Sequence, residues 1–261
     1  MDRDAYGRFS ERLRERLATD ERVLGLVALG SMSGEPPPDQ WSDHDFFVIS
    51  RPGEQERMRT ELSWLPDGEE IVLAYRETAH GVKVLYRDAH LIEFAVFDPE
   101  EMSVARINRF RVLLDRGGVA ERMRALRERT AGDLADRRPD LRWSSGQMLT
   151  ALLVGAGRYR RGERVDGRAL IQAAANQLAQ LLAAAVPSEN AGAVDTLDPL
   201  RRFEQVYPRL GRELDESLGR PPVESALRLL RIALRELPQR IAEFPLEAAR
   251  AVEASIEADS R

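Results

Sequence analysis

The spacing of apolar residues changes once along this sequence, near Pro99, and that change limits the folds available to the chain. Before it, short apolar runs of strand length alternate with turn residues. After it, apolar residues recur at the three- and four-residue spacing of helices. The sequence therefore predicts an α/β domain with a mixed sheet over residues 1–100, followed by an all-α helical bundle domain over residues 101–261.

The same patterns predict the individual elements of both domains. Proline and glycine residues mark where one element ends and the next begins. In the first domain we expect helices over 6–18 and 54–64, and strands over 24–29, 46–49, 71–75, 82–86 and 91–97. In the second domain we expect helices over 101–114, 119–137, 145–160, 168–186, 198–218 and 223–257.

The composition excludes several classes of site. The chain has no cysteine, which rules out disulfides and thiolate metal sites, and its three histidines argue against a zinc site. Its net charge of −5 argues against a nucleic-acid partner. No apolar signal segment opens the sequence, and no apolar run reaches the length of ~18 residues that a membrane helix needs. We therefore expect a cytoplasmic protein without a membrane partner.

The stretch from Leu29 to Ile49 carries the strongest chemical signal. Gly30 and Ser31 directly follow an apolar run, and such a pair can approach a phosphate with a backbone amide and a hydroxyl. Asp43 and Asp45 lead into the next apolar run, and their two-residue spacing places them on one face of a strand. Such a pair repels unless a divalent cation lies between the carboxylates, and hard oxygen ligands suit Mg²⁺. The alternative interpretation is a solvated acidic turn.

Glu93 is the next residue that points to a site. It lies in the apolar run LIEFAVF, and a carboxylate there is costly unless it is paired, hydrogen-bonded or bound to a metal. We interpret it as a functional group. The alternative is a structural glutamate at the edge of a strand, paired with one of the many arginines.

The helical half offers one candidate ligand-binding face. Arg168, Gln172 and Asn176 are spaced by four in a predicted helix that is otherwise rich in alanine and leucine. Amides both donate and accept hydrogen bonds, which suits a hydroxyl-rich ligand. A solvated helix face explains the same pattern.

Taken together, these motifs resemble the nucleotidyltransferase superfamily of the polymerase-beta type, and within it the lincosamide and aminoglycoside nucleotidyltransferases. The superfamily signature is a Gly-Ser pair followed after a gap by Asp-x-Asp or Asp-x-Glu, matched here by Gly30-Ser31 and by Ser42 to Asp45. Glu93-Phe94 and the run Arg161-Gly162-Glu163 resemble the antibiotic-modifying branch. One departure is that Gly34 follows Gly30 by four residues, where the family usually has five.

The resemblance implies transfer of a nucleoside monophosphate, usually AMP from ATP, to a hydroxyl of a small molecule. It implies that Asp43 and Asp45 bind Mg²⁺, and that Glu93 is either the general base or a further metal ligand. It assigns nucleotide binding to Gly30, Ser31 and Ser42, and it suggests a homodimer. Two alternatives stay open: a regulator or antitoxin-like protein with this fold, and an enzyme that modifies a protein or RNA.

Overall fold

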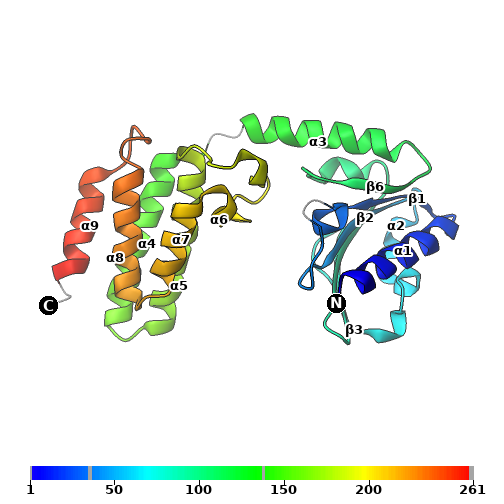
Figure 1. The fold of residues 1–261 in the computed structure, drawn as a ribbon, viewed down its shortest axis with the longest axis horizontal. Helices are drawn as coiled ribbons and strands as arrows, with labels where there is room; N and C mark the ends of the chain where they lie inside the picture. Colours follow the sequence, from blue (N-terminus) through cyan, green and yellow to red (C-terminus); the bar gives the residue numbers. More distant parts are fainter. Residues whose placement is uncertain (1, 35–36, 137–138, 259–261) are drawn as a thin grey trace. The chain divides into compact units, whose positions relative to one another are not determined.

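The computed structural model describes residues 2–34, 37–136 and 139–258 (Figure 1). The chain divides into two compact units, Met1–Ala135 and Asp136–Arg261. The end of the helix predicted over 119–137 lies outside the described residues. No helix in the described ranges is both long and apolar enough to cross a membrane.

The first unit is built on a six-stranded sheet with the strand order β3-β4-β5-β2-β1-β6. Strands β2 and β5 are parallel, and the other neighbouring strands are antiparallel, so the sheet is mixed as predicted. The strands are β1 (Val23–Ala28), β2 (His44–Ser50), β3 (Ile71–Arg76), β4 (Gly81–Tyr86), β5 (Leu91–Phe97) and β6 (Arg111–Asp115). The first five confirm the strands expected from the sequence.

Strand β6 corrects the prediction of a helix over 101–114. Residues Glu101–Val104 form a short 3-10 helix, and Arg111–Asp115 pair with β1. A five-residue edge strand depends on its partner rather than on local spacing, so the apolar pattern alone could not reveal it. The first unit consequently continues to Ala135, beyond the boundary expected near residue 100.

Helices cover both faces of this sheet. On one face α1 (Arg3–Thr19) buries Tyr6, Phe9, Leu13 and Leu17 against a core that includes Phe46 and Val48. On the other face α3 (Val119–Asp136) buries an apolar stripe against side chains of β1, β2 and β5. That stripe consists of Val119, Met123 and Leu126.

Two caps explain where these helices begin. Asp2 caps α1 by accepting a hydrogen bond from the Ala5 amide at 2.7 Å. Asp115, the last residue of β6, accepts hydrogen bonds from the Val119 and Ala120 amides and so fixes the start of α3. The single helix expected over 54–64 is instead α2 (Gln55–Thr60) followed by the 3-10 turn Leu62–Trp64. A further 3-10 turn, Gly68–Glu70, precedes β3.

The second unit is a helical bundle, as predicted. Its main helices are α4 (Leu141–Arg160), α5 (Arg164–Ala185), α6 (Phe203–Val206), α7 (Pro208–Leu218), α8 (Pro222–Glu236) and α9 (Leu246–Ala258), with a 3-10 turn at Ala191–Ala193. Two predicted helices are divided. Pro208 starts α7 and so separates it from α6, and Pro238 and Pro245 interrupt the helix expected over 223–257.

Helices α4 and α5 pack closely at two glycines. A Cβ added at Gly167 would lie 2.7 Å from the Tyr159 amide nitrogen and 2.8 Å from the Gly155 carbonyl oxygen. One added at Gly155 would lie 3.0 Å from the Gly167 carbonyl oxygen. The absence of both side chains therefore allows the two helix backbones to approach each other.

Candidate active site

The sheet brings two of the predicted catalytic carboxylates together. Asp45 of β2 and Glu93 of β5 are direct partners in the parallel register of these two strands. Both side chains are partly exposed, while the residues that alternate with them, such as Phe46 and Phe94, are buried against α1. Asp43 immediately precedes β2. Alternation assigns Asp43, Asp45 and Glu93 to one face of the sheet, at the end where β2 begins.

The residue between the two aspartates holds this segment from the opposite face. His44 is fully buried, its Nδ1 lies 2.7 Å from Nε2 of His90, and its Nε2 lies 2.9 Å from Oγ of Ser10. Its ring also stacks on Tyr6, with 3.7 Å between ring centroids. Burial lowers the pKa of His44 to about 3, so the ring is neutral at physiological pH.

Tyr6 links the two parts of the predicted motif. Its hydroxyl donates a hydrogen bond to the Asp43 carbonyl oxygen at 2.9 Å and lies 3.5 Å from Oγ of Ser31. Burial raises the pKa of Tyr6 to about 12, so the hydroxyl keeps its proton and remains a donor. Tyr6 is a positioning residue that the sequence patterns did not single out, since it reads as one more apolar position of α1.

The Gly-Ser pair lies where the sequence places it, in a tight turn directly after β1. Residues Gly30–Ser33 form one 3-10 turn, in which Gly30 has φ +45° and Gly34, at its end, has φ +96°. These left-handed conformations favour glycine at both positions. The Leu29 amide donates to the Asp45 carbonyl oxygen at 2.8 Å, so the turn begins beside the aspartates.

Ser42 has a structural partner in the loop before β2. Its hydroxyl accepts a hydrogen bond from the Asp39 amide at 2.9 Å and donates to Asp39 Oδ1 at 3.1 Å. Ser42 thus shapes the approach to Asp43. Its predicted contact with a nucleotide stays a prediction.

Glu93 has a partner that the sequence analysis did not name. The Lys83 ammonium, on β4, lies 3.0 Å from Oε1 of Glu93 and 2.8 Å from Oε1 of Glu77. These contacts, first with Glu77 and then with Glu93, raise the pKa of Lys83 above its usual value. The alternative interpretation of Glu93 expected an arginine partner, and the cation is instead the lysine directly opposite in the β4–β5 register.

The resemblance implies that Asp43, Asp45 and Glu93 hold a magnesium ion. Within the described ranges, no group of three or more His, Asp or Glu side chains is placed so that it could hold a metal ion, so the structure does not bring Asp43, Asp45 and Glu93 together as one set of three ligands. Mg²⁺ is commonly bound by one or two carboxylates, with water and substrate phosphates completing its shell. Asp43 and Asp45 lie near the Gly30-Ser31 turn and are of a residue type that suits such a metal, and their binding of Mg²⁺ stays a prediction.

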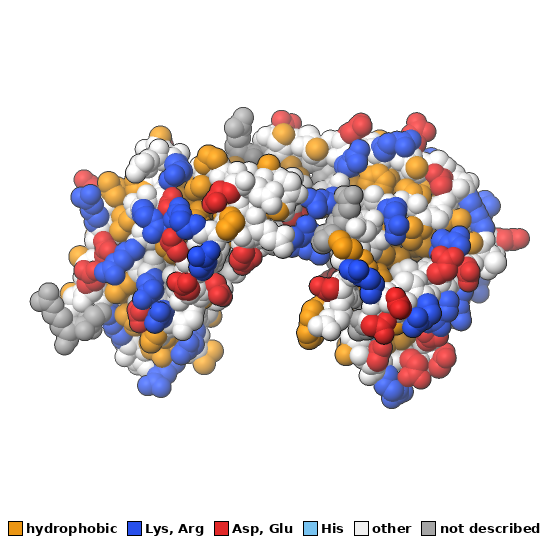
Figure 2. Space-filling model, viewed as in Figure 1, with side chains coloured by type: hydrophobic (Ala, Val, Ile, Leu, Met, Phe, Trp, Pro, Cys, Tyr) orange, Lys and Arg blue, Asp and Glu red, His pale blue; other side chains and the backbone are white. Residues whose placement is uncertain are grey.

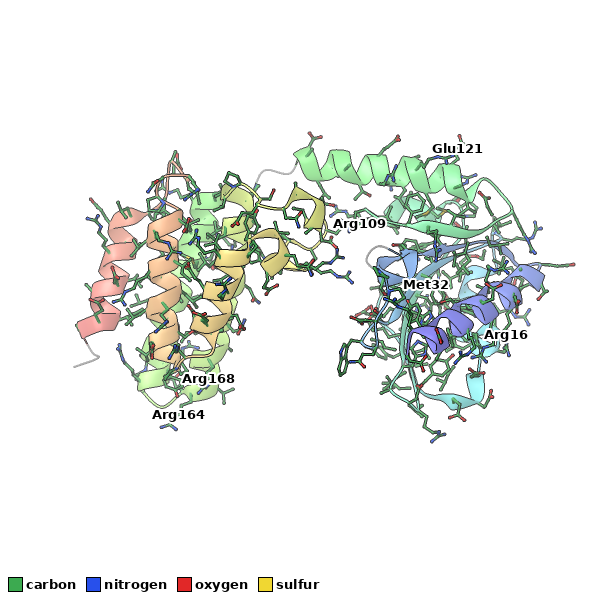
Figure 3. All side chains as sticks on the ribbon, in the orientation of Figure 1. Arg16, Met32, Arg109, Glu121, Arg164 and Arg168 are labelled. Atoms are coloured by element: carbon green, nitrogen blue, oxygen red, sulfur yellow. The ribbon has the colours of Figure 1, made fainter. Side chains whose placement is uncertain are left out.

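Arg111 is a candidate functional residue that the sequence analysis missed. It lies on β6 opposite Ala28, and its guanidinium donates to the carbonyl oxygen of Met32 at 3.1 Å. Met32 belongs to the turn after β1 and is labelled in Figure 3. An exposed cation beside a Gly-Ser turn is suited to a phosphate. The assignment of residues 101–114 to a helix concealed this proximity.

The predicted polar face of the bundle lies in the second unit, on the exposed side of α5. Arg168, labelled in Figure 3, stacks over the ring of Tyr159 at 5.4 Å. Nε2 of Gln172 donates to Oδ1 of Asn176 at 3.2 Å. The three side chains share a face as expected, and their role in binding a substrate stays a prediction.

No family model matches this chain, and no curated protein matches it. Among solved structures it is similar to an aminoglycoside 6-adenyltransferase from Bacillus subtilis, with 9% identity, 96% of each chain covered and a TM-score of 0.35. It is also similar to a nucleotidyltransferase-like protein from Exiguobacterium sibiricum, with 13% identity, 96% of this chain and 88% of that chain covered, and a TM-score of 0.31. With identities and TM-scores this low, neither similarity identifies a function for this chain.

Proposed function

We propose that this chain is a Mg²⁺-dependent nucleotidyltransferase that transfers AMP from ATP to a hydroxyl group of a small molecule. The observation that carries the proposal is the pairing of Asp45 with Glu93 at the start of β2, beside the turn that contains Gly30 and Ser31. Metal-binding carboxylates and a phosphate-binding turn are the two parts that nucleotidyl transfer requires.

In the proposed reaction, the acceptor hydroxyl oxygen forms a bond to the α-phosphorus of ATP. The bond between that phosphorus and the bridging oxygen of pyrophosphate breaks, and pyrophosphate leaves with the electron pair. Glu93 takes the proton of the hydroxyl, or it supplies a further oxygen to the metal. Both roles use a carboxylate oxygen on the same face as Asp45.

The remaining residues bind and orient the triphosphate. Asp43 and Asp45 would hold Mg²⁺, which supplies neutralisation of the charge that develops on the phosphates. Gly30 and Ser31 offer a backbone amide and a hydroxyl to the phosphate oxygens. Arg111 adds a cation beside the same turn.

For the acceptor we propose a hydroxylated small molecule of the lincosamide or aminoglycoside type, which is the class that the sequence resemblance implies. The distribution of charge supports a small acceptor over RNA. Arginines and acidic side chains are interspersed over the face shown in Figure 2, and the net charge is −5. RNA binding commonly relies on a broad basic surface.

The direct test is transfer of label from α-labelled ATP to a panel of hydroxylated small molecules. We expect a labelled product with Mg²⁺ and none with EDTA or with Asp45→Ala. Labelled product that forms equally well with the Asp45→Ala protein would refute the proposal.

Glu93→Gln separates the roles of this residue, and Glu77→Gln is its matched control. Each variant removes one carboxylate from Lys83, but only Glu93 is paired with Asp45. As a base, Glu93→Gln should lower kcat by about 10²–10⁴-fold and leave Mg·ATP binding intact. As a metal ligand, it should also raise the Mg²⁺ concentration required for half-maximal activity. If both variants keep native kcat, Glu93 serves only as a partner of Lys83.

A further inference from the structure

The sheet face that bears Asp45 and Glu93 is covered by α3 over β1, β2 and β5, and beyond that core, on β4 and β3, its side chains are partly or largely exposed. The strand registers place a polar row on it: Tyr75, Lys83, Glu93 and Asp45 are successive cross-strand partners on β3, β4, β5 and β2. A second row lies next to it, formed by Leu73, Leu85 and Leu91, which are partners on β3, β4 and β5. We call this second set the leucine row.

The leucine row faces away from the core under α1. Along β4 and β5 the alternating residues Val82, Val84 and Ile92 are buried in that core, so Leu85 and Leu91 point to the opposite face. Both are only partly buried. At the edge strand, Leu73 is 50% exposed and its neighbour Tyr75 is 48% exposed. These apolar side chains are therefore accessible to a ligand within the first unit.

The leucine row is continuous with the candidate active site. Asp45 pairs with Glu93, so extending the parallel register by two residues places Leu91 beside Asp43. The apolar surface thus begins at the metal-binding aspartates and leads away from them to the sheet edge.

We propose that the leucine row binds the hydrocarbon part of the acceptor, while Asp43, Asp45 and Glu93 act on its hydroxyl. The inference rests on the function proposed above. It specifies the acceptor as an amphipathic small molecule with a hydroxylated polar head joined to an apolar group. A uniformly polar, polycationic sugar would leave the leucines in contact with water and lose that binding energy.

Two observations favour a small molecule over a protein partner on this face. Three leucine side chains provide far less area than the ~800 Å² per partner that stable protein interfaces bury. In addition, the register of β3 against β4 shifts between Ile71 and Leu73, and an irregularity of this kind disfavours addition of another strand at the edge.

The test compares two acceptors with identical sugar hydroxyls, octyl β-D-glucoside below its micelle concentration and methyl β-D-glucoside. Ligand-observed saturation-transfer NMR gives their Kd values without any requirement for turnover. We expect octyl glucoside to bind about tenfold more tightly or better, with saturation greatest on its alkyl protons. Leu73→Ser should weaken octyl glucoside binding several-fold. Val104→Ser, which alters a 63% exposed apolar side chain on the 3-10 helix Glu101–Val104, is the matched control and should not.

Equal affinity for the two glucosides, or equal effects of Leu73→Ser and Val104→Ser, would overturn the inference. So would a change in molar mass of the Leu73→Ser protein in light scattering, since it would show that a second copy covers the leucine row. A separate assay of AMP transfer to both glucosides distinguishes the two proposals. Alkyl-dependent binding supports the leucine row whether or not AMP is transferred to a glucoside, because the label-transfer panel with Asp45→Ala decides the proposed function. Transfer with equal KM for both glucosides refutes the leucine row alone.

Discussion

The buried histidine between the two aspartates makes the stability of the first unit depend on pH in a calculable way. His44 is 0% exposed, and its pKa falls from 6.5 to about 3 on folding, because burial disfavours the charged ring. Below pH 6.5 the unfolded chain therefore binds a proton that the folded chain does not bind. The contribution of His44 to the free energy of unfolding is complete above pH 6.5 and decreases as the pH falls. It stops decreasing near the folded pKa of about 3.

The magnitude follows from the linkage relation. Each pH unit below the unfolded pKa lowers the free energy of unfolding by about 1.4 kcal/mol, so acidification from about pH 7.5 to about pH 5 should cost about 2 kcal/mol through His44. His90, whose pKa burial also lowers, adds to the loss with the same sign. Carboxylates that have arginine partners, such as Asp20, contribute mainly at lower pH, because their pKa values are lowered on folding.

The assay is urea unfolding at these two pH values with EDTA present, followed by tryptophan fluorescence. Of the three tryptophans, Trp64 is buried in the core of the first unit, while Trp41 and Trp143 are 85% and 61% exposed. The signal therefore reports mainly on the first unit. We expect His44→Gln to be less stable at the higher pH but to lose much less stability on acidification. His80→Gln, which alters a partly exposed histidine, should keep the wild-type loss. Equal losses in the wild type and His44→Gln would refute the reasoning.

Three further predictions concern the site and the bundle. Asp43→Ala or Asp45→Ala should abolish transfer while the protein stays folded; turnover and thermal melting measured on one preparation check this. ATP with Mg²⁺ at ~100 times Kd should stabilise the protein by about 2.7 kcal/mol and ATP with EDTA much less, and equal shifts in thermal melts would contradict a metal-dependent site. Gly167→Ala should cost about 1–3 kcal/mol in urea unfolding followed by circular dichroism, because its Cβ would meet backbone atoms of α4. Gly146→Ala, with open space around it in the same bundle, should instead stabilise by about 0.5–1 kcal/mol.

The sequence predicted those parts of the fold that local patterns determine. Strands β1 to β5 follow from alternating apolar runs between turn residues, and the turn after β1 follows from its glycines. Strand β6 could not be predicted in this way, because Arg111–Asp115 becomes a strand only by pairing with β1. The helix breaks at Pro208 and Pro238 were missed for a different reason. Both prolines are visible in the sequence, but the apolar residues around them keep a helical spacing, and that spacing was given more weight.

Within the site, residue types were predictable and their partners were not. To predict that Asp43 and Asp45 share a face, it is enough to recognise one strand. To predict the Lys83–Glu93 pair, the register of the β4–β5 hairpin must also be known. That register could have been derived by counting residues back from the turn around Asp88. The contacts of Tyr6 could not be derived from the sequence, because they depend on how α1 crosses the sheet.

Successive side chains at the start of β2 point to opposite faces of the sheet, so neighbouring residues of one short segment have different roles. Asp43 and Asp45 lie toward the face that also carries Glu93 and Lys83. His44 lies toward the other face, where its ring contacts Tyr6, Phe9 and His90. These contacts hold the segment that carries both aspartates against the core under α1. Substitutions at neighbouring positions should therefore act differently: loss of an aspartate should abolish transfer and leave the fold intact, while loss of His44 should lower stability and impair transfer only by loosening the aspartates.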